Sequence, residues 1–427
     1  MGGIRYRLIL FLFVTPLILC QCKSTATGDN LLLENGASEF VRIDPARPTE
    51  LTYKSKPYRF SSTNSYSMLN SKSSADKQFA LMEEMGLNAL RMWGFWNGGP
   101  DSLQPSYGSY NEDKWKLFDY VVATAGKKGI KLIITLSNYW FDYGGIELLN
   151  KWLGFPDEVA KYKDREIFFK DMRTKILYAK YVEDVLNRKN TITGVLYKDD
   201  PAIMMWEPIN EIRGRTDPSG QLAVDWMTWA AQLIKKSDPH HLISDGAEGL
   251  LMNHPAHRNY PWQTKNPLPS TLPDGSSVSN VSEGAYFETL CPIPAIDVCS
   301  IHAWPGNWFM SYADKPDEFV EQWIEEHIAY MKKNKGFQKP LFVGEFGWQI
   351  VRNRGAKAQE ERKQVFEKAY FRTAKNQRKI REEVSGIGFW NITGGGIDQN
   401  VLTFDVICPD DKEVCPLIKE FSKAQLQ

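Results

Sequence analysis

The sequence predicts a single α/β domain with the (β/α)8, or TIM-barrel, fold. Eight short apolar runs that fit buried strands occur along the chain, and helical patterns separate most of them, which is typical of βαβ units. The chain has 427 residues, and single barrels with insertions reach this length. No GxGxxG or GxxxxGK(S/T) motif follows any of the eight runs, so the sequence gives no support to a nucleotide-binding alternative.

The expected elements follow one another in a regular order. The strands are expected over residues 58–63, 87–92, 130–136, 202–206, 241–244, 297–301, 340–343 and 386–390. The helices are expected over residues 76–85, 114–125, 171–188 and 224–236, and charged helices precede the last two strands. Gly86 and Gly129 stand where the first two helices should stop, which is a position that glycine favours.

Residues 253–290 interrupt this order because they are rich in Pro, Ser and Asn. We interpret them as a long loop between the fifth and sixth strands, over the barrel face where the strands end. His254 and His257 in this loop have HxxH spacing, but no third ligand follows at a metal-site spacing. We therefore expect no metal, and no other sequence feature calls for a cofactor.

The first 22 residues have the features of a signal peptide. Arg5 and Arg7 precede an apolar run over residues 8–19, which is too short to span a membrane comfortably. We therefore expect an exported protein. Residues 23–40 should form a flexible tether, and residues 41–427 should form the one folded domain.

Two cysteines, Cys20 and Cys22, directly follow the apolar run. A cysteine in this place suggests a lipoprotein-type signal, with membrane attachment through an N-terminal lipid. The preceding residues, Leu19 and Gln21, are larger than usual at such a site. Secretion and lipid anchoring at the cell envelope both stay open.

Charge and composition limit the kinds of molecule that this protein is expected to bind. Lys+Arg and Asp+Glu are equal at 52 each, so the formal net charge is zero, which argues against nucleic acid as the main partner and suits a neutral substrate. Aromatic residues make up 13% of the chain, including 14 Trp. Most of these rings should be core, but an excess of Trp also fits a cleft that binds sugars. We expect a monomer.

The four remaining cysteines form two pairs that are close in sequence: Cys291 with Cys299, and Cys408 with Cys415. Three connectivities are allowed, and the pairing of sequence neighbours is the simplest. Disulfides fit an exported protein. Free buried thiols are the alternative.

Two glutamates stand at strand ends, where functional groups gather in parallel barrels. Glu211 follows the fourth strand in the segment WEPINE, and Glu345 follows the seventh in EFGW. Two carboxylates that face each other across a barrel mouth are what glycoside hydrolysis needs, since one protonates the leaving oxygen and the other attacks the anomeric carbon. Glu207 lies close to Glu211 in sequence, and we interpret it as structural or supporting.

These segments resemble glycoside hydrolase family 5, and within it the endo-β-1,4-mannanases of the plant and fungal type. The resemblance covers residues 40–420. It is carried by the motifs LNALRMWGF (87–95), SNYWFDYGG (137–145), NTITGVLYKDDPAIMMWEPINEIRG (190–214), WAAQLIKKSDPHHLISDGAEG (229–249), IPAIDVCSIHAWPGNW (293–308), KPLFVGEFGW (339–348) and GFWNITGGG (388–396).

The resemblance implies a role for each matching residue. Glu211 matches the acid/base, and Glu345 matches the nucleophile. Asn210 matches the residue that holds the substrate 2-hydroxyl. Arg91 matches an arginine that hydrogen-bonds the nucleophile and keeps it ionised. His302 matches a cleft histidine beside the acid/base.

Two tryptophans complete the implied site. Trp390 matches the platform under the sugar at the scissile subsite. Trp304 stands where many relatives have a tyrosine that donates a hydrogen bond to the nucleophile. The indole N–H is also a donor, so this role can survive with altered geometry.

Chemistry alone leads to the same two carboxylates. Glu211 should carry a raised pKa so that it starts protonated, and Glu345 should stay ionised. The reaction should pass through a covalent glycosyl-enzyme, with Glu211 then acting as base. Four aromatic residues after the second and third strands are expected either to stack on distal sugars or to pack in the core: Trp93, Trp96, Trp140 and Tyr143.

The leading expectation is therefore endo-acting, retaining cleavage of β-1,4-mannosidic bonds in mannan or glucomannan. Another β-1,4-glycanase activity, such as an endoglucanase or a mannosidase, is the alternative within the same class. A non-catalytic surface protein that binds glycans is the alternative from another class. The full set of both glutamates with Arg91, Asn210 and His302 argues against the binding protein.

Overall fold

The structure is a computed structural model. It describes residues 38–157, 165–251, 283–305, 315–334, 337–350, 355–374, 384–393, 404–408 and 410–425. The signal peptide predicted over residues 1–22, the two cysteines at its end, and the HxxH pair lie outside the described residues. In the described part, no helix combines the length and apolar character that a membrane crossing requires.

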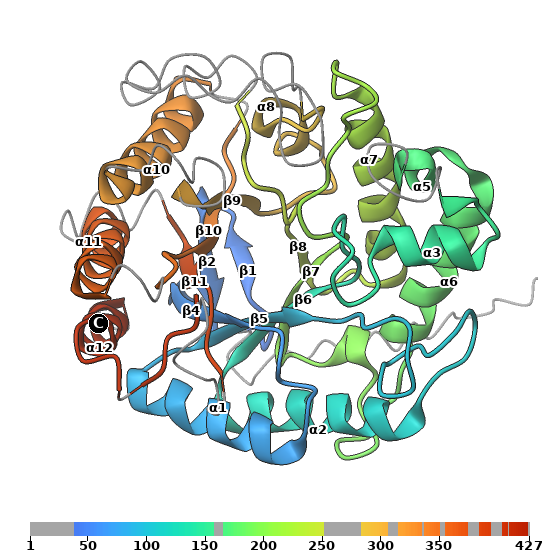
Figure 1. The fold of residues 1–427 in the computed structure, drawn as a ribbon, viewed down its shortest axis with the longest axis horizontal. Helices are drawn as coiled ribbons and strands as arrows, with labels where there is room; N and C mark the ends of the chain where they lie inside the picture. The colour runs from blue at the N-terminus through green and yellow to red at the C-terminus, as the bar shows by residue number, and fades with distance from the viewer. Residues whose placement is uncertain are drawn as a thin grey trace, which may run out of the picture.

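Eight parallel strands form the centre of the molecule (Figure 1), and all eight predicted strands are confirmed. They are β4 (Phe60–Ser65), β5 (Ala89–Trp93), β6 (Lys131–Thr135), β7 (Ile203–Glu207), β8 (Leu242–Ile243), β9 (Cys299–Ala303), β10 (Leu341–Phe346) and β11 (Gly386–Phe389). The sheet has the order β8-β7-β6-β5-β4-β11-β10-β9. A parallel bridge between Ser244 and Val298 joins the two outer strands and completes the ring.

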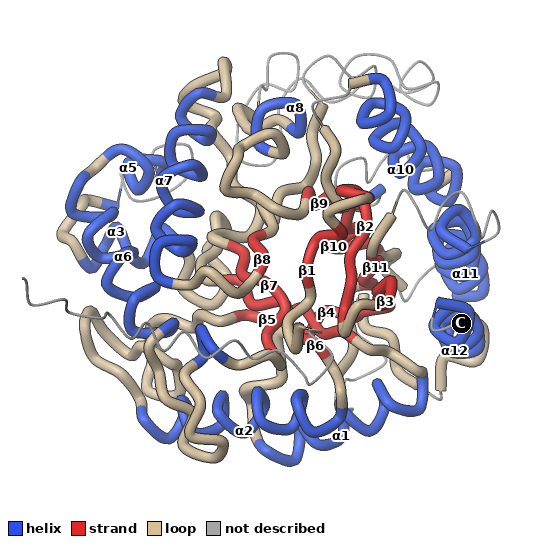
Figure 2. Tube along the Cα trace, turned by 180° about the vertical axis from the view of Figure 1, so that it is seen from behind, coloured by secondary structure: helices blue, strands red, loops and turns tan. Residues whose placement is uncertain are grey.

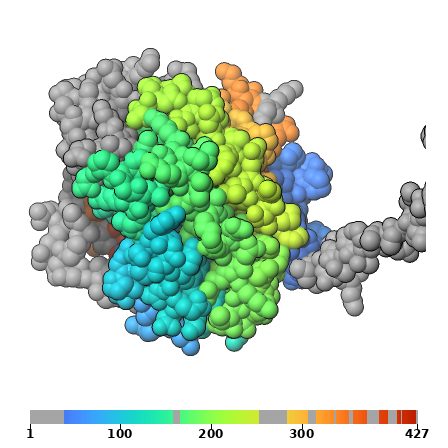
Figure 3. All heavy atoms as spheres, turned by 90° about the vertical axis from the view of Figure 1, so that its right-hand side faces the viewer, coloured from blue at the N-terminus to red at the C-terminus, as the bar shows by residue number. Residues whose placement is uncertain are grey.

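Helices surround the strands as an outer layer (Figure 1). They are α1 (Lys72–Met85), α2 (Glu112–Lys128), α3 (Ile146–Trp152), α5 (Ile167–Lys170), α6 (Met172–Leu186), α7 (Gln221–Ser237), α8 (Phe287–Leu290), α10 (Pro316–Lys333), α11 (Gly355–Ala374) and α12 (Val414–Gln425). On one side, α3, α5, α6 and α7 form a closely packed face (Figure 3).

The predicted helices are all present, with shifted ends. α1 begins earlier than expected, because the Ser71 side chain accepts a hydrogen bond from the Ser74 N–H at 3.1 Å and caps the helix. Gly86 ends this helix in the left-handed conformation, with φ 71°. The loop predicted over 253–290 is wrong at its last four residues, since Phe287–Leu290 form α8. Residues 253–282 of that loop lie outside the described residues.

A small antiparallel sheet precedes the barrel, and the sequence did not predict it. It contains β1 (Arg42–Asp44), β2 (Arg47–Tyr53) and β3 (Lys56–Tyr58). Figure 2 shows it at the centre of the strand ring, seen from behind. Its buried Leu51 shares an apolar cluster with barrel residues such as Phe60 and Ile133, so the sheet covers the amino-end opening of the barrel.

The tether predicted over residues 23–40 is too long at its C-terminal end. The described chain begins at residue 38, and the Phe40 side chain is buried against the rings of His240 and His241. Burial of an aromatic ring removes a large apolar surface from water, which fixes this segment to the domain.

Two disulfides have the predicted pairing. Cys291 bonds to Cys299, with their Cα atoms 5.1 Å apart, and Cys408 bonds to Cys415, with their Cα atoms 5.8 Å apart. The alternative of free thiols is therefore wrong for these four cysteines. The first disulfide joins the segment after α8 to the start of β9, and the second closes a short loop before α12.

Candidate active site

A buried arginine organises the carboxyl end of the barrel. Arg91, on β5, is fully buried, and its Nη1 donates to Glu345 Oε1 at 2.6 Å. Its Nε donates to Glu207 Oε2 at 2.8 Å. Its remaining bonds reach Asn210 Oδ1 at 2.8 Å and Asn64 Oδ1 at 3.1 Å. One guanidinium thus fixes four side chains, from β4, from β10 and from the end of β7, which its planar set of donors permits.

The two predicted glutamates lie close together at the barrel mouth. Glu345 belongs to β10, and Glu211 follows β7 with φ 51°, a left-handed conformation that its N–H stabilises by bonding Gly246 O at 2.9 Å. One oxygen from each carboxylate and one ring nitrogen of His302 all lie within 4.8 Å of one another. This separation leaves no room for the attacking water that inverting enzymes hold between carboxylates about 6.5–9.5 Å apart.

Each carboxylate has its own donors. His302 Nδ1 lies 2.5 Å from Glu211 Oε1 and 3.6 Å from Glu345 Oε2. The Trp304 indole N–H donates to Glu345 Oε2 at 2.9 Å, so it makes the contact expected of it in spite of the departure from tyrosine. The Trp140 indole N–H donates to Glu211 Oε2 at 2.5 Å, a contact that the sequence did not predict.

The raised pKa expected for Glu211 is wrong. Burial raises the pKa of Glu211, but the hydrogen bond and positive charge of His302, with the charge of Arg213, outweigh burial and hold that pKa below its ordinary value. Burial and the charge of Glu211 raise the pKa of Glu345, against the lowering effect of His302 and Arg91. Burial lowers the pKa of His302, but the two glutamates outweigh it and raise that pKa overall.

Glu207 lies beneath this group and is fully buried. Besides the bond from Arg91, its Oε2 accepts from Thr135 Oγ1 at 2.6 Å, and its Oε1 accepts from Ser244 Oγ at 3.3 Å. Donors on both oxygens hold this buried carboxylate in one orientation. These contacts agree with the supporting interpretation.

Asn210 is held from two sides. Its Oδ1 accepts from Arg91, and its Nδ2 donates to Asn138 Oδ1 at 3.0 Å. Both asparagines are buried, so the orientation of the Asn210 amide is fixed before any ligand arrives. A signal for Asn138 was available, because it lies inside the motif SNYWFDYGG.

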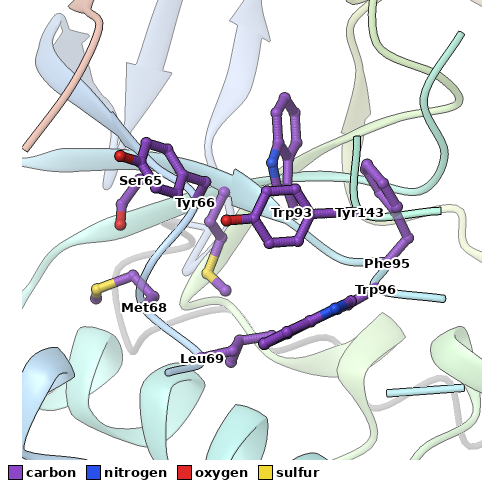
Figure 4. A pocket seen from close by; sticks show the side chains of 9 residues that line it. Ser65, Tyr66, Met68, Leu69, Trp93, Phe95, Trp96 and Tyr143 are labelled. Atoms are coloured by element: carbon purple, nitrogen blue, oxygen red, sulfur yellow. The ribbon is translucent and has the colours of Figure 1, made fainter. Parts of the chain in front are cut away.

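Aromatic rings line one side of the mouth. Trp390, half-buried after β11, lies 6.0 Å from the Tyr66 ring in a stacked arrangement and 5.8 Å from the Trp93 ring. Tyr66, Trp93, Trp96 and Tyr143 are among the residues that line a pocket here (Figure 4). Trp93 is only 8% exposed, which favours its core-packing alternative.

The opposite side of the mouth is charged. The guanidinium of Arg213 lies 5.6 Å from the centre of the half-buried Trp140 ring, and it forms ion pairs with Glu248 and with Glu283, the latter at 2.6 Å. Arg215 also pairs with Glu283, at 2.6 Å. The two arginines follow Glu211 directly in the motif NEIRGR, which was the available signal for them.

Among the described residues, Glu211, His302 and Glu345 also form the one group of metal-ligating side chains close enough to share an ion. Each carboxylate oxygen in the group, however, already has a nitrogen partner: Arg91 and Trp304 donate to Glu345, Trp140 donates to Glu211, and His302 Nδ1 lies 2.5 Å from the other Glu211 oxygen. This pattern fits two carboxylates held for acid–base and nucleophilic work, and we assign no metal to them.

The comparisons with known proteins agree with this geometry. The family model described as GH family 5 beta-mannosidase-like matches residues 38–261 and 262–405. The putative mannan endo-1,4-beta-mannosidase 9 of Oryza sativa subsp. japonica is 31% identical over 97% of each chain. Mannan endo-1,4-beta-mannosidase 7 of Arabidopsis thaliana is 29% identical, over 97% of this chain and 91% of the relative.

Solved structures give the same result. The hyperthermostable endo-1,4-beta-D-mannanase from Thermotoga petrophila is 28% identical to this chain, and its structure superposes with a TM-score of 0.69. The superposition covers 86% of this chain and 99% of that one. The endo-1,4-beta-mannanase from Rhizomucor miehei, at 24% identity and a TM-score of 0.71, shares the barrel fold. With a family model that matches most of its length, the chain belongs to glycoside hydrolase family 5, in the beta-mannosidase-like group.

Proposed function

We propose that this glycoside hydrolase is an endo-acting, retaining enzyme that cleaves β-1,4-mannosidic bonds in mannan or glucomannan. One observation carries the chemistry: oxygens of Glu211 and Glu345 lie within 4.8 Å of each other, each with its own donors. Retaining enzymes place their carboxyl groups about 5–5.5 Å apart, so that one attacks the sugar directly. The names of the relatives support mannan as the polymer.

The reaction would run in two steps. Glu345 attacks the anomeric carbon while Glu211 gives its proton to the leaving oxygen, and a covalent glycosyl-enzyme forms. Glu211 then removes a proton from water, and the water displaces Glu345 with net retention of configuration. Arg91 and Trp304 hold Glu345 in place through both steps, since they donate to its two different oxygens.

The remaining polar and aromatic groups would position the sugar. Asn210, fixed between Arg91 and Asn138, presents its amide to the substrate 2-hydroxyl. Trp390 provides the platform for the ring at the scissile bond, and the pocket beside it contributes Trp96 and Tyr143 for a further sugar. Preorganised groups of this kind speed a reaction because they need no rearrangement in the transition state.

A reducing-sugar assay on mannan, glucomannan, cellulose and xylan tests the polymer. We expect mannan or glucomannan to react fastest, and faster turnover of carboxymethylcellulose would contradict the proposal. Exo-acting mannosidase is the second candidate, because the matching family model is described as beta-mannosidase-like. Mannopentaose separates the two: an endo enzyme releases a mixture that includes mannobiose and mannotriose, whereas an exo enzyme at first releases mannose and mannotetraose.

Two variants test the roles of the glutamates. Glu345→Gln should abolish turnover of every substrate, because no covalent intermediate forms. Glu211→Ala should lose roughly 100- to 10,000-fold on polysaccharide and less on an activated aryl mannoside, which needs no proton. Added azide should accelerate the Glu211→Ala variant and yield a β-mannosyl azide. An α-configured first product from the wild-type enzyme would rule out the retaining route.

We also propose that the mature enzyme is exported and works as a monomer, attached to the cell envelope by a lipid on Cys20 or Cys22. Three features of the first 22 residues support export and the lipid: Arg5 and Arg7, the apolar run over residues 8–19, and the cysteines that follow that run. Mass spectrometry of the native protein should find an acylated N-terminal cysteine. An unmodified N-terminus further along the chain would exclude the lipid anchor but leave export intact. Light scattering should give the mass of a monomer.

A further inference from the structure

Residues 404–408, which follow β11 in the chain, pack beside the end of that strand. Ile392 and Val406 form a parallel bridge, and the Val406 N–H donates to the Asn391 backbone oxygen at 2.9 Å. At the end of the segment, the disulfide of Cys408 joins it to α12. The segment is therefore fixed to the barrel at its middle and to the helix layer at its end.

A buried arginine also fixes the first two residues of this segment. Arg362, on α11, is 3% exposed, and its Nη2 donates to the backbone oxygens of Phe404, at 2.9 Å, and of Asp405, at 2.5 Å. Its Nη1 lies 3.5 Å from Asp411 Oδ2. A buried charge is costly unless it is paired and hydrogen-bonded, so these acceptors hold the guanidinium and the backbone together.

The Phe404 side chain packs against the Trp304 indole. The two rings lie edge to face, with their centres 5.0 Å apart and their planes at 81°, which is a favourable arrangement for an aromatic pair. Trp390 lies edge-on to the same indole at 6.3 Å. The backbone of Gly347 approaches so closely that a Cβ atom added there would lie 3.1 Å from the indole. Trp304 is only 6% exposed, so these neighbours leave its indole few other orientations.

The orientation of this indole matters because its N–H donates to Glu345 Oε2 at 2.9 Å. A hydrogen bond weakens steeply when the donor turns away from the acceptor. If the Phe404 ring were absent, the indole would lose its contact on one side and gain freedom to turn. The nucleophile would then have a less constant donor on this oxygen.

We propose that Phe404 is a positioning residue for the nucleophile. Its ring holds the Trp304 indole so that the indole N–H stays directed at Glu345. Arg362 fixes the backbone that carries the Phe404 ring, because it donates to the Phe404 oxygen itself. This inference rests on the proposed function, in which Glu345 attacks the sugar, and it adds to that function a residue that follows the last barrel strand.

The titration of Glu345 should report this contact. Burial raises the pKa of Glu345. Of the charged groups that face it, His302 and Arg91 lower this pKa, and Glu211 raises it. The Trp304 N–H lowers the same pKa, because it bonds the charged form. An indole that turns away therefore raises the pKa of Glu345. Since the attack needs a carboxylate, the acidic limb of the kcat/KM profile should then move to higher pH.

Phe404→Ala tests this role through the pH profile of kcat/KM on mannan. At the pH optimum, kcat/KM should fall roughly two- to tenfold, the range that the energy of one edge-to-face contact permits. The acidic limb should move to higher pH, and an unmoved limb would overturn the proposal. Phe404 is half-buried, so the variant should fold. Phe404→Tyr keeps the ring and should stay close to the wild type.

A double-mutant cycle shows whether Phe404 acts through the indole. Trp304→Phe has no indole N–H to direct, so adding Phe404→Ala to it should move the acidic limb no further. An equal shift in both backgrounds would overturn the proposal. Arg362→Lys offers one nitrogen to two backbone oxygens and should move the limb in the same direction as Phe404→Ala. An unmoved limb in Arg362→Lys would refute the part assigned to the arginine.

The matched control is Phe337→Ala. Phe337 is also half-buried, and its ring lies edge-on to that of Tyr330 with the centres 5.1 Å apart. It precedes β10, whereas Glu345 lies near the other end of that strand. The control should lower the Tm and leave the pH profile unchanged. If it moved the acidic limb as far as Phe404→Ala does, loss of stability alone would explain the shift and the proposal would fail.

The titration can also be followed without substrate. In protein labelled with 13C at the glutamate carboxyl carbon, and with Glu345 assigned by Glu345→Gln, the midpoint should be higher in Phe404→Ala than in the wild type. Equal midpoints in an enzyme that hydrolyses mannan would refute the positioning role and leave the proposed function standing. Conversely, a higher midpoint in a protein that fails on every mannan would refute the function and leave the effect of Phe404 on Glu345 standing.

Discussion

Arg91→Lys tests the centre of the site most directly. The arginine donates four hydrogen bonds, two of them to buried carboxylates, in three directions from one plane. A lysine keeps the charge but has a single nitrogen, which can stay close to only one of Glu207 and Glu345. The variant therefore loses one bond between two charged groups, worth about 1.5–3 kcal/mol, and weaker bonds to the uncharged asparagine amides, worth about 0.5–1.5 kcal/mol each.

Together these losses should lower the free energy of unfolding by roughly 3–5 kcal/mol, which is also the range seen when a buried ion pair is broken. The pH dependence should change as well. The charge of Arg91 lowers the pKa of Glu345, so a weaker contact raises that pKa. Because Glu345, the proposed nucleophile, works as a carboxylate, activity should be lost as the pH falls through this pKa. The acidic limb of the kcat/KM profile should therefore move to higher pH in the variant.

Thermal unfolding and kcat/KM on mannan between pH 4 and 8 measure both effects. Arg188→Lys is the matched control, because Arg188 also forms paired bonds to a buried carboxylate, Asp119, at 2.9 and 2.7 Å, but lies between α6 and α2, on the outside of the barrel. It should lower the Tm and leave the pH profile unchanged. A wild-type pH profile in Arg91→Lys, or an equal shift in Arg188→Lys, would refute the reasoning.

The other predictions concern a second donor and a disulfide. Trp304→Phe removes the N–H that bonds Glu345 at 2.9 Å, and such a bond is worth about 1.5–3 kcal/mol, so kcat/KM on mannan should fall at least tenfold and the acidic limb of its pH profile should move to higher pH. Trp304→Tyr restores a donor and should recover part of the loss. Equal activity of the two variants would contradict this prediction. Replacing Cys408 and Cys415 by serine removes the disulfide between two residues with a sequence separation of 7. The free energy of unfolding should fall by about 2 kcal/mol, and kcat at 25 °C should stay unchanged. An unchanged Tm would count against a stabilising role of this disulfide.

The barrel strands were predictable because their signals are local. Each is a short apolar run next to a helical pattern, and stops such as Gly86 and Gly129 mark where the pattern changes. The small sheet in front of the barrel has no such signal. β2 has the sequence RPTELTY, with a proline and few apolar residues, and it is stable because Leu51 fits the amino-end opening of the finished barrel. That opening exists only in the tertiary structure.

The identities of the site residues were predictable for the same reason that the strands were. Parallel strands bring their carboxyl ends to one rim, so Arg91, Glu211, His302 and Glu345 had to meet there once the strands were placed. The contact of the Trp140 indole with Glu211 could not be predicted this way. This contact depends on how the loop between β6 and α3 folds back over the barrel mouth. From sequence alone, an aromatic residue in a loop can equally well pack in the core, stack on a sugar or donate a hydrogen bond.

The directions of the pKa shifts in this site could not be deduced from the identities of the residues alone. The acid of this reaction must start protonated, and this requirement was the basis for expecting a raised pKa at Glu211. Instead, His302 Nδ1 lies 2.5 Å from Glu211 and 3.6 Å from Glu345, so the ring interacts more strongly with the acid than with the nucleophile. Groups this close titrate together, and the number of protons on the three matters more than the pKa of any one.

The proposed mechanism requires the proton of this group to lie on Glu211 rather than on Glu345. Arg91 and Trp304 donate to both oxygens of Glu345, and these donors favour its anionic form. His302 Nδ1 lies within hydrogen-bond distance of Glu211 Oε1, at 2.5 Å, but 3.6 Å from Glu345 Oε2, so the ring exchanges a proton with Glu211 and leaves Glu345 to its two N–H donors.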